Sequence, residues 1–562
     1  MANLFDGYTH DLLNAPLGAA SHSRAYDEMF LDPGASAGAL QARPSYEGLK
    51  QVFERMTFDD LQGRADAIGA SYLAQGVTFD YAGEERAFPL DGVPRIISEE
   101  EWAVLEAGVQ QRVEALEAFL DDVYGHQNAI RDGVIPARVV VSSPGYLRQA
   151  VGVVSDNGVR VQVAGIDLIR DESGQWRVLE DNVRVPSGVS YVISNRDVMT
   201  QTLPELFAAL RVRSVDEYPS RLLAALRAAA PAGVEDPTVV VLTPGVFNSA
   251  YFEHTLLARL MGVELVEGRD LFCSNGYVWM RTTAGPQRVD VIYRRVDDEF
   301  LDPLQFRADS VLGAPSLLTA ARAGHVTLAN GVGNGVADDK LVYTYMPDLI
   351  KYYLGAEQII PNVKSWRLEE PDALEEVLDR LPELVVKPVD GSGGKGLVVG
   401  AQASQAELDK LRATLLDNPR GWIAQPIVQL ATIPTVIDGG IHPRHSDLRP
   451  FAVNSGDGVW VLPGGLTRVA LPEGRLVVNS SQGGGSKDTW VLGHGDLPSA
   501  DLPEHPAVFG RRTNGTPRPQ LYMDVNPDDP ARFMQQQQHQ QQAGGPAPAC
   551  AHVTANGGDG PC

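Results

Sequence analysis

One stretch of the sequence restricts the fold more than any other, because an apolar strand, a glycine turn, a helix and a second strand follow one another in it. The stretch is "PTVVVLTPGVFNSAYFEHTLLARLMGVELVEGRDL", beginning at Pro237. A crossover helix carries the chain back to the same end of a sheet, so the two strands it joins run parallel. The chain is therefore predicted to be an α/β protein that contains a parallel sheet.

Flanking segments extend this pattern in both directions. The stretch "EEEWAVLEAGVQQRVEALEAFLDDVYG" has apolar residues at helical spacing, and the chain up to about Pro136 is predicted to be mostly helical. Predicted strands follow at "ARVVVSS", "GVRVQVAGIDLIR", "QWRVLEDN" and "VDVIYRRVDDEFLDP". A helical region is expected near 203–229, helices and strands over about 338–400, and short strands over about 420–492.

Charge and cysteine content narrow the classes of function. A formal net charge of −25 argues against a nucleic-acid-binding protein, which needs a basic face, but a local basic pocket can still bind a small anion. The three cysteines, Cys273, Cys550 and Cys562, are too few for a disulfide framework or a cysteine metal site, and they fit a reducing cytoplasm. No apolar run reaches the length of a membrane helix, and the start does not resemble a signal peptide.

The last part of the chain has a different composition. After about Asp496, proline, glycine and polar residues dominate, ending in "MQQQQHQQQAGGPAPACAHVTANGGDGPC". Such low complexity predicts a disordered tail. A cytoplasmic protein without nucleic-acid or membrane partners is expected, and nothing in the sequence indicates an oligomeric state.

The stretch "ELVVKPVDGSGGKGLVVG" predicts a phosphate-binding loop. Lys387 directly follows a short apolar strand and can supply a positive charge for phosphates. Glycine lets backbone amides approach phosphate oxygens closely. The alternative interpretation is a glycine-rich hairpin with a surface lysine, and no Gly-Lys-Ser/Thr opens a helix as in a Walker A loop. The loop residues concerned are Gly391, Ser392, Gly393, Gly394 and Gly396.

A second nucleotide-binding feature is predicted about thirty residues further on, at "GWIAQPIVQL". A strand interrupted by Gln425 and Pro426 suggests a strand that becomes a linker, whose backbone groups near Gln425 and Ile427 can bind an adenine edge. Alternatively, this is only a proline in an edge strand.

Acidic and amide side chains at one hairpin predict a metal site. The turn sequence "DESG" joins two predicted strands, and centring the turn there puts Asp167 opposite Val178, with Glu180 diagonal to it on the same face. Asn182 shares that face, and two carboxylates with an amide oxygen suit magnesium. A register slip, or a bulge near Ala164-Gly165, would change the faces, and a solvated acidic hairpin end is the alternative.

Taken together, these motifs resemble ATP-grasp ligases. "VVKPVDGSGGKG" followed by "IAQPIV" is similar to their nucleotide-binding half, and "ADDKLVYTYMPDLIKYYLGAEQIIPNV" to the segment with their other ATP-contacting lysine, here Lys340. "HSDLRPFAV" resembles the strand with an arginine directed at the γ-phosphate, here Arg449, and "LPGGLTRVA" offers Arg468. In an ordinary ATP-grasp chain the metal-binding Asp and Glu-x-Asn come last, whereas here they come first.

This reversed order resembles the circularly permuted ATP-grasp family, type two, related to glutathionylspermidine-synthase-like ligases; "LEDNVRVPSGVSYVISNR", "YRRVDDEFLDP" and "GNGVADDK" carry the likeness. The resemblance covers roughly 20–495 and implies ATP and magnesium as cofactors. It implies a permuted ATP-grasp fold, α+β in the ATP-grasp part. The expected parts are a helical N-terminal region (1–136), the metal-bearing half (137–200), a pre-ATP-grasp βαβ domain (201–330), the nucleotide-binding half (331–495) and the tail (496–562).

The resemblance also implies a reaction. A carboxylate attacks ATP to give an acyl phosphate and ADP, and an amine displaces phosphate to form an amide, with peptide- or polyamine-like substrates. Arg184 is a candidate for binding a carboxylate or phosphate, or a surface residue, and Ser187 for contacting the acceptor. Arg294 and Arg295 are candidates for an anionic substrate, although pairing with Asp297 and Asp298 is the simpler interpretation.

Two other functions use the same ATP site. One is an ATP-binding regulatory or partner protein without turnover, and the other is phosphoryl transfer to an alcohol or phosphate. Retention of Asp167, Glu180 and Asn182 together argues against the first, because a protein that does not turn over has no need of metal ligands.

Overall fold

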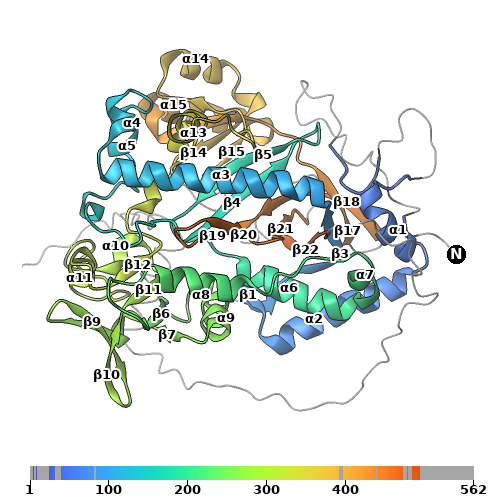
Figure 1. The fold of residues 1–562 in the computed structure, drawn as a ribbon. Helices are drawn as coiled ribbons and strands as arrows, with labels where there is room; N and C mark the ends of the chain where they lie inside the picture. Colours follow the sequence, from blue (N-terminus) through green and yellow to red (C-terminus); the bar gives the residue numbers. More distant parts are fainter. Residues whose placement is uncertain are drawn as a thin grey trace, which may run out of the picture.

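The computed structural model describes residues 4–5, 8, 25–31, 40–81, 84–390, 396–437, 440–471, 478 and 484–493. Within them, helices surround one large central sheet, and smaller sheets lie on either side of it (Figure 1). This mixture of helices and sheets confirms the predicted fold class. The described residues include no helix with the length and apolar character needed to cross a membrane. The predicted tail, 496–562, lies outside them.

The central sheet has nine strands, drawn from both ends of the described chain. Seven follow the order β20-β19-β4-β18-β21-β22-β3, while β5 pairs with β4 and β17 pairs with β18. Only β22 and β3 run parallel to each other. The strands are β3 (Leu90–Ile97), β4 (Val163–Arg170), β5 (Trp176–Asn182), β17 (Thr432–Ile437), β18 (Gly440–Arg449), β19 (Phe451–Asn454), β20 (Val459–Val461), β21 (Leu466–Val469) and β22 (Gly485–Val491).

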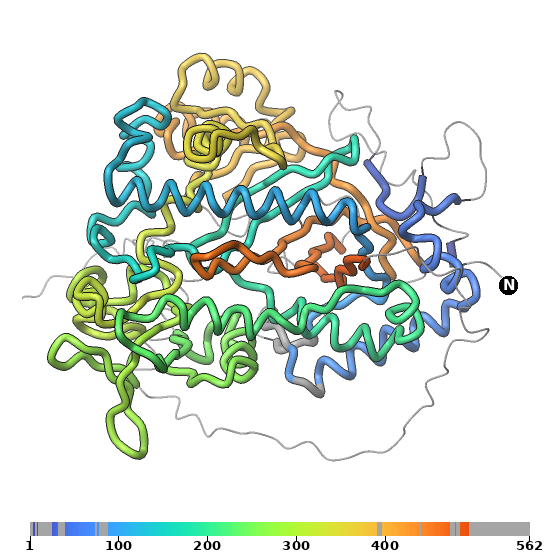
Figure 2. Tube along the Cα trace, in the orientation of Figure 1, coloured from blue at the N-terminus to red at the C-terminus, as the bar shows by residue number. Residues whose placement is uncertain are grey.

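The hairpin β4–β5 comes early in the chain but lies among strands from its far end. Strand β4 sits between β19 and β18, with Leu168 opposite Leu448 and Ala164 opposite Ala452. Figure 2 shows the hairpin running beside the C-terminal strands. Residues separated by about half of the chain are therefore neighbours in one sheet.

Helices cover both faces of this sheet and form two cores. The long helix α3 (Glu99–Tyr124) packs on one face. It is capped by Ser98, whose side chain accepts a hydrogen bond from the Glu101 amide. Helices α2 (Phe58–Gln75) and α6 (Val189–Thr202) lie on the other face (Figure 1). Successive side chains of β4 point into the two cores in turn: Val163 packs on the α6 side and Ala164 on the α3 side.

A separate four-stranded parallel sheet, ordered β12-β11-β6-β7, confirms the βαβ unit expected near Pro237. A three-stranded antiparallel sheet, β10-β9-β8, projects from this region (Figures 1 and 2). The elements are α8 (Tyr218–Ala228), β6 (Val239–Leu242), α9 (Tyr251–Met261), β7 (Glu264–Val266), β8 (Leu271–Ser274), β9 (Tyr277–Thr282), β10 (Gly285–Val289), β11 (Val291–Arg294), α10 (Asp298–Leu301), α11 (Leu317–Arg322) and β12 (Thr327–Ala329).

The predicted nucleotide-binding segment forms a small antiparallel sheet, β13-β16-β14-β15, with its own apolar core under two helices. Short helices connect it to the rest of the chain. The elements are α12 (Lys340–Tyr343), α13 (Met346–Leu354), β13 (Trp366–Arg367), α14 (Pro371–Asp379), β14 (Leu384–Pro388), β15 (Val398–Val399), α15 (Gln405–Asp417) and β16 (Trp422–Pro426).

Two expectations for the N-terminal third need correction. The stretch "ARVVVSS" forms helix α5 (Ala137–Val141), because Pro136 precedes its first turn and only Val139 and Val140 are buried. The region before Pro136 is mainly helical but also contributes β3 to the central sheet. Its other elements are α1 (Glu47–Phe53), β1 (Thr78–Tyr81), β2 (Glu84–Ala87) and α4 (Asn128–Arg131), and helix α7 (Pro204–Ala209) follows α6. The domain boundaries stay predictions.

Candidate active site

One cavity of about 490 Å³ brings together most of the residues singled out in the sequence. Its volume lies within the range of small-molecule sites. It lies where the central sheet, the small antiparallel sheet and the parallel sheet meet. The predicted residues that line it are Asp167, Glu180, Asn182, Arg184, Ser187, Arg295, Lys340, Lys387, Gln425, Ile427, Arg449 and Arg468.

The acidic hairpin reaches the cavity through a β-bulge. Asp167 lies directly opposite Glu180, and Leu168 opposite Val178, so Leu179 is the extra residue of the bulge. Before the bulge, Val178 packs into the core; after it, Glu180 and Asn182 face the cavity. The predicted pairing of Asp167 with Val178 is therefore wrong, and the bulge is not at Ala164-Gly165.

Asp167 belongs to a buried cluster of two carboxylates and two guanidinium groups. Both of its oxygens accept from Arg449, one of them at 2.7 Å, and Arg468 donates to it at 2.7 Å. Arg468 also binds Asp447, which lies opposite it in the β18–β21 ladder, at 2.6–3.0 Å. Two acids and two bases balance one another in charge, which makes their common burial possible.

The pKa values in this cluster move in opposite directions. Burial alone would raise the pKa of Asp167, but Arg449 and Arg468 outweigh it and hold that pKa well below its usual range. Burial raises the pKa of Asp447 to about 6, against the opposing effect of Arg468. Asp167 therefore stays negatively charged as the pH falls, and Asp447 is the carboxylate of the cluster that is protonated first.

Both predicted lysines face the acidic hairpin. Lys340 opens α12, where its backbone amide donates to the carbonyl oxygen of Val389 at 3.0 Å, and its ammonium lies 3.7 Å from Glu180. Lys387 ends β14. Burial lowers the pKa of Lys387 to about 8; Glu180 opposes this shift and Lys340 adds to it. Both ammonium groups lie on the side of the cavity that faces Glu180, where their positive charge can attract an anionic ligand.

The predicted loop glycines Gly391, Gly393 and Gly394, together with Ser392, lie outside the described residues. Gly396 is described and does not line the cavity; its φ of 74° is in the left-handed region that favours glycine.

The linker predicted after Gln425 is present. Gln425 pairs with Val385 inside the small sheet, and beyond Pro426 the chain leaves that sheet and enters β17 of the central sheet at Thr432. Gln425 and Ile427 both line the cavity. Apolar side chains surround this end and suit a flat aromatic ring: Ile169, Leu179, Val363, Val385, Leu397, Val399, Val428, Leu430 and Val478.

The donor set at the hairpin fits magnesium. No group of three or more His, Cys, Asp or Glu side chains in the described part of the chain is arranged to hold a metal ion. Magnesium, however, commonly binds one or two carboxylates together with substrate phosphates. Glu180 is a quarter exposed. The buried amide nitrogen of Asn182 has no hydrogen-bond partner among the described residues, so this amide can turn its oxygen toward a cation. Both Asp167 oxygens are engaged by Arg449 and Arg468, so this carboxylate could contribute to a metal site only after one of the two arginines had moved away.

The candidate substrate residues divide into two groups. Arg184, Ser187 and Arg295 line the cavity, and the Ser187 carbonyl oxygen accepts from Arg449 at 3.2 Å. Arg294 does not line it; its guanidinium binds three backbone carbonyl oxygens and pairs with Asp298, as the simpler interpretation held. Arg295 pairs with Glu253 at 2.8 Å and not with an aspartate.

Sequence reasoning missed several lining residues. Asp447 stands two positions before Arg449 in "HSDLR", and this spacing on one strand face was the available signal. Asp297 and Asp338 also line the cavity, although the sequence motifs that contain them did not predict this. The turn of the βαβ unit contributes Asn248, Ser249 and Ala250, as expected for ligand sites at the carboxyl ends of parallel strands.

The family described as circularly permuted ATP-grasp type 2 matches this chain over residues 94–470. An uncharacterized protein of Mycobacterium tuberculosis is 60% identical over 471 residues, which cover 84% of each chain. An uncharacterized protein of Synechocystis is 50% identical over 83% of this chain and 97% of its own length.

Two further comparisons concern proteins with names that mention a reaction. A Frankia casuarinae protein, provisionally named glutamate–cysteine ligase, is 46% identical over 83% of this chain; the match covers 53% of that protein. A solved structure of a glutathione synthetase-like effector from Globodera pallida has a TM-score of 0.52 and 10% identity, covering 78% of this chain and 98% of the effector. The latter similarity is one of fold.

Proposed function

The chain belongs to the circularly permuted ATP-grasp type 2 family of ligases, and we propose that it joins a carboxylate to an amine with Mg-ATP, releasing ADP and phosphate. The observation that carries the proposal is the single cavity in which the acidic hairpin faces both lysines and both arginines. These groups come from opposite ends of the chain: Asp167 and Arg449 are 282 positions apart. A nucleotide site and a metal-binding hairpin in one cavity are what phosphoryl transfer requires.

In the proposed complex, the apolar end of the cavity binds adenine beside Gln425 and Ile427. Lys340 and Lys387 hold the phosphates as point charges. Arg449 and Arg468 already lie next to the hairpin, and each presents a planar fork that suits phosphate oxygens. Asp447 keeps Arg468 in place at 2.6 Å when Arg468 exchanges Asp167 for phosphate.

Glu180 and Asn182 would hold magnesium, with Asp167 joining after Arg449 turns away. When bound, the ion would neutralise negative charge on the phosphates. This exchange links two events: Arg449 turns toward the γ-phosphate, and the Asp167 carboxylate it leaves behind becomes available to a cation.

The reaction proceeds in two balanced steps. A substrate carboxylate oxygen attacks the γ-phosphorus, the bond to the bridging oxygen breaks, and ADP leaves with that electron pair. The amine nitrogen then attacks the acyl carbon, the carbon–oxygen bond to phosphate breaks, and phosphate leaves as the ammonium group gives up two protons in all. Excluding water protects the acyl phosphate between the steps.

We propose peptide- or polyamine-like substrates in the cytoplasm, where thiols stay reduced. The Frankia protein supports the reaction class, because its name describes amide formation between a carboxylate and an amine. The chain spans about half of that protein, so the name supports this class of reaction and not those two substrates.

The test begins with the purified full chain, Mg-ATP and fractionated metabolite extracts, with ADP release as the measurement. Active fractions are then supplied with ¹⁸O-labelled carboxylates. The proposal predicts one ¹⁸O atom in the released phosphate and an amide product by mass spectrometry. A phosphorylated product without free phosphate would instead identify a phosphotransferase. Tight Mg-ATP binding without ADP release from any fraction would identify a nucleotide-binding protein.

A further inference from the structure

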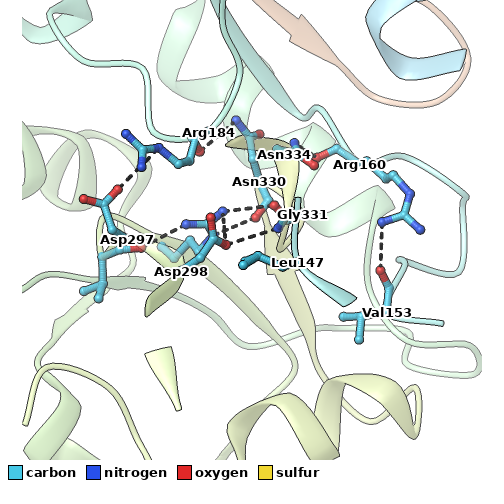
Figure 3. Close-up of polar contacts among 12 residues, drawn as sticks. Leu147, Val153, Arg160, Arg184, Asp297, Asp298, Asn330, Gly331 and Asn334 are labelled. Atoms are coloured by element: carbon cyan, nitrogen blue, oxygen red, sulfur yellow. Dashed lines mark hydrogen bonds and ion pairs between the residues drawn. The ribbon is translucent and has the colours of Figure 1, made fainter. Parts of the chain in front are cut away.

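At the end of the cavity next to the arginine cluster, the Arg184 side chain lies between two aspartates and makes no hydrogen bond to any described residue. The Arg184 Nε atom is 3.6 Å from Asp297 and 3.8 Å from Asp338. Both aspartates line the cavity, and the Arg184 side chain is 39% exposed toward it. Figure 3 shows Arg184 and Asp297 turned toward one another.

Each of the other arginines at or beside the cavity has at least one carboxylate partner within hydrogen-bond distance, whereas Arg184 has none in the described part of the chain. Arg295 binds Glu253 at 2.8 Å, Arg294 binds Asp298 at 3.0 Å, and Arg468 binds Asp447 at 2.6 Å. Those distances are normal for charge-assisted hydrogen bonds, whereas 3.6–3.8 Å is too long for one. The N–H groups of the Arg184 guanidinium can therefore donate hydrogen bonds to a ligand that enters the cavity.

The backbone beneath Arg184 is nevertheless rigid. The Asn330 side chain donates to the carbonyl oxygens of Val163 and Val183 at 2.7 and 2.9 Å, and the Asn334 side chain donates to that of Val183 at 3.1 Å. Asp338 accepts from the Val183 amide at 2.7 Å. Figure 3 shows Asn330 and Asn334 close to Arg184, and the Asn330 side chain also donates to the Arg184 carbonyl oxygen at 3.4 Å. A loose side chain on a fixed backbone is typical of a binding group that is positioned in advance.

A second observation points to a ligand at the same end. Arg295 is 2% exposed, lines the cavity and donates to the carbonyl oxygen of Pro186 at 2.7 Å. Its Nε atom is buried and has no hydrogen-bond partner in the part of the chain that the structure describes. A buried donor without an acceptor is costly, and a polar ligand removes that cost.

We propose that this end of the cavity binds the amine substrate through a zwitterionic α-amino acid group, with its carboxylate on Arg184 and its ammonium against the cavity-facing oxygens of Asp297 and Asp338. The proposal rests on the proposed function and narrows it to amino acids and to compounds that keep a free α-amino acid group. A guanidinium fork binds a carboxylate through two hydrogen bonds, and two carboxylates hold an ammonium group. A polyamine would use the aspartates but would leave Arg184 and Arg295 without acceptors.

The contact between Ser187 and Arg449 places this group beside the phosphate-binding end. Ser187 lies three residues after Arg184, and its carbonyl oxygen is 3.2 Å from the Arg449 guanidinium. An amine bound against the two aspartates therefore lies at the reacting end of the cavity and away from the apolar end.

The experiment measures binding of the standard L-amino acids to the full chain in the presence of magnesium and a non-hydrolysable ATP analogue, by saturation-transfer NMR. For each amino acid that binds, the N-acetyl derivative and the carboxamide are measured too. We expect at least one amino acid to bind, and each derivative to bind roughly tenfold to a hundredfold more weakly, the factor for one charge-assisted hydrogen bond.

Variants assign the two ends of the ligand. Arg184→Gln should abolish the preference for the free acid over the carboxamide, and Asp297→Asn should abolish the preference over the N-acetyl form. Arg213→Gln is the matched control, because Arg213 is 37% exposed, lies 3.8 Å from Glu106 and does not line the cavity. It should retain both preferences. Binding of the ATP analogue to every variant confirms that the variant is folded.

The possible failures are distinguishable. If the analogue binds but no amino acid does, or if spermidine binds and amino acids do not, the zwitterion site is wrong and the ligase proposal stands. If both preferences survive in Arg184→Gln and Asp297→Asn, the site is elsewhere. If the analogue itself does not bind the wild-type chain, the proposed function fails first.

Discussion

Glu180 is the residue whose replacement should separate folding from chemistry. It faces the cavity after the bulge, with Lys340 at 3.7 Å and Arg449 at 3.9 Å from its carboxylate. Glu180→Gln keeps the shape but loses the charge that a magnesium ion needs, so ADP release should fall to background while the melting temperature changes little. Glu172→Gln, on the exposed turn of the same hairpin, is the control and should keep full activity. Equal activity in Glu180→Gln would remove the metal assignment.

Lys387 should make the affinity for nucleotide depend on pH. Burial lowers its pKa to about 8 in the free protein, and phosphate groups favour the charged ammonium. Below pH 8 the charge is already present. Above it, binding must be accompanied by uptake of a proton, so affinity for the ATP analogue should fall, approaching roughly tenfold per pH unit.

Calorimetric titrations between pH 7 and pH 10 check this expectation. Lys387→Arg, whose guanidinium stays charged throughout that range, should bind with an affinity that does not fall in this way. A parallel decline in both proteins would assign the pH dependence to another group.

At the scale of elements, a buried ion pair fixes strand β5 to helix α3. Arg112 donates to both oxygens of Asp181, at 2.5 and 2.8 Å, and to Asn362 at 2.7 Å. Asp181 lies between Glu180 and Asn182 but points away from the cavity, so this pair holds the hairpin from behind.

Breaking the pair should therefore destabilise the protein. Arg112→Met leaves the Asp181 charge buried without a partner, which costs about 3–5 kcal/mol. Arg112→Met combined with Asp181→Leu should recover a large part of that loss. Denaturant unfolding of the two variants beside the wild type measures the difference, and equal stability of single and double variants would contradict it.

The β4–β5 hairpin also shows how much of the structure can be predicted from the sequence. The order of strand, glycine turn, helix and strand predicted the parallel sheet. The resemblance to permuted ATP-grasp proteins predicted that the acidic hairpin meets the lysines and arginines in one cavity. The bulge at Leu179 was not predictable, because centring the turn at "DESG" with a regular ladder pairs Asp167 with Val178, whereas the structure pairs it with Glu180. Helix α5 was missed because three consecutive valines favour a strand locally, whereas packing of Val139 and Val140 decides the outcome.

Long-range contacts account for the other differences. Asp447 was overlooked because its importance depends on Arg468, which lies opposite it on a neighbouring strand. Arg295 was expected to pair with a nearby aspartate, but the fold brings Glu253 from helix α9 to it instead. Partners that are close only in space require the structure.

At the scale of the whole molecule, the cavity connects three sheets, so a ligand should couple them. Its lining residues come from the central sheet, the small antiparallel sheet and the turn after β6. Hydrogen exchange with and without magnesium and an ATP analogue should show slower exchange in peptides from β5, β14 and β18 together. In Glu180→Gln the magnesium-dependent part in β5 should disappear. Protection limited to the small sheet would contradict a shared site.

A crystal structure of the chain with magnesium and a non-hydrolysable ATP analogue tests the central claim most directly. The account predicts a triphosphate within contact distance of Lys387 and Arg449, and an ion bound to its oxygens and to Glu180. A nucleotide bound elsewhere, or one whose phosphates point away from the β4–β5 hairpin, would contradict it.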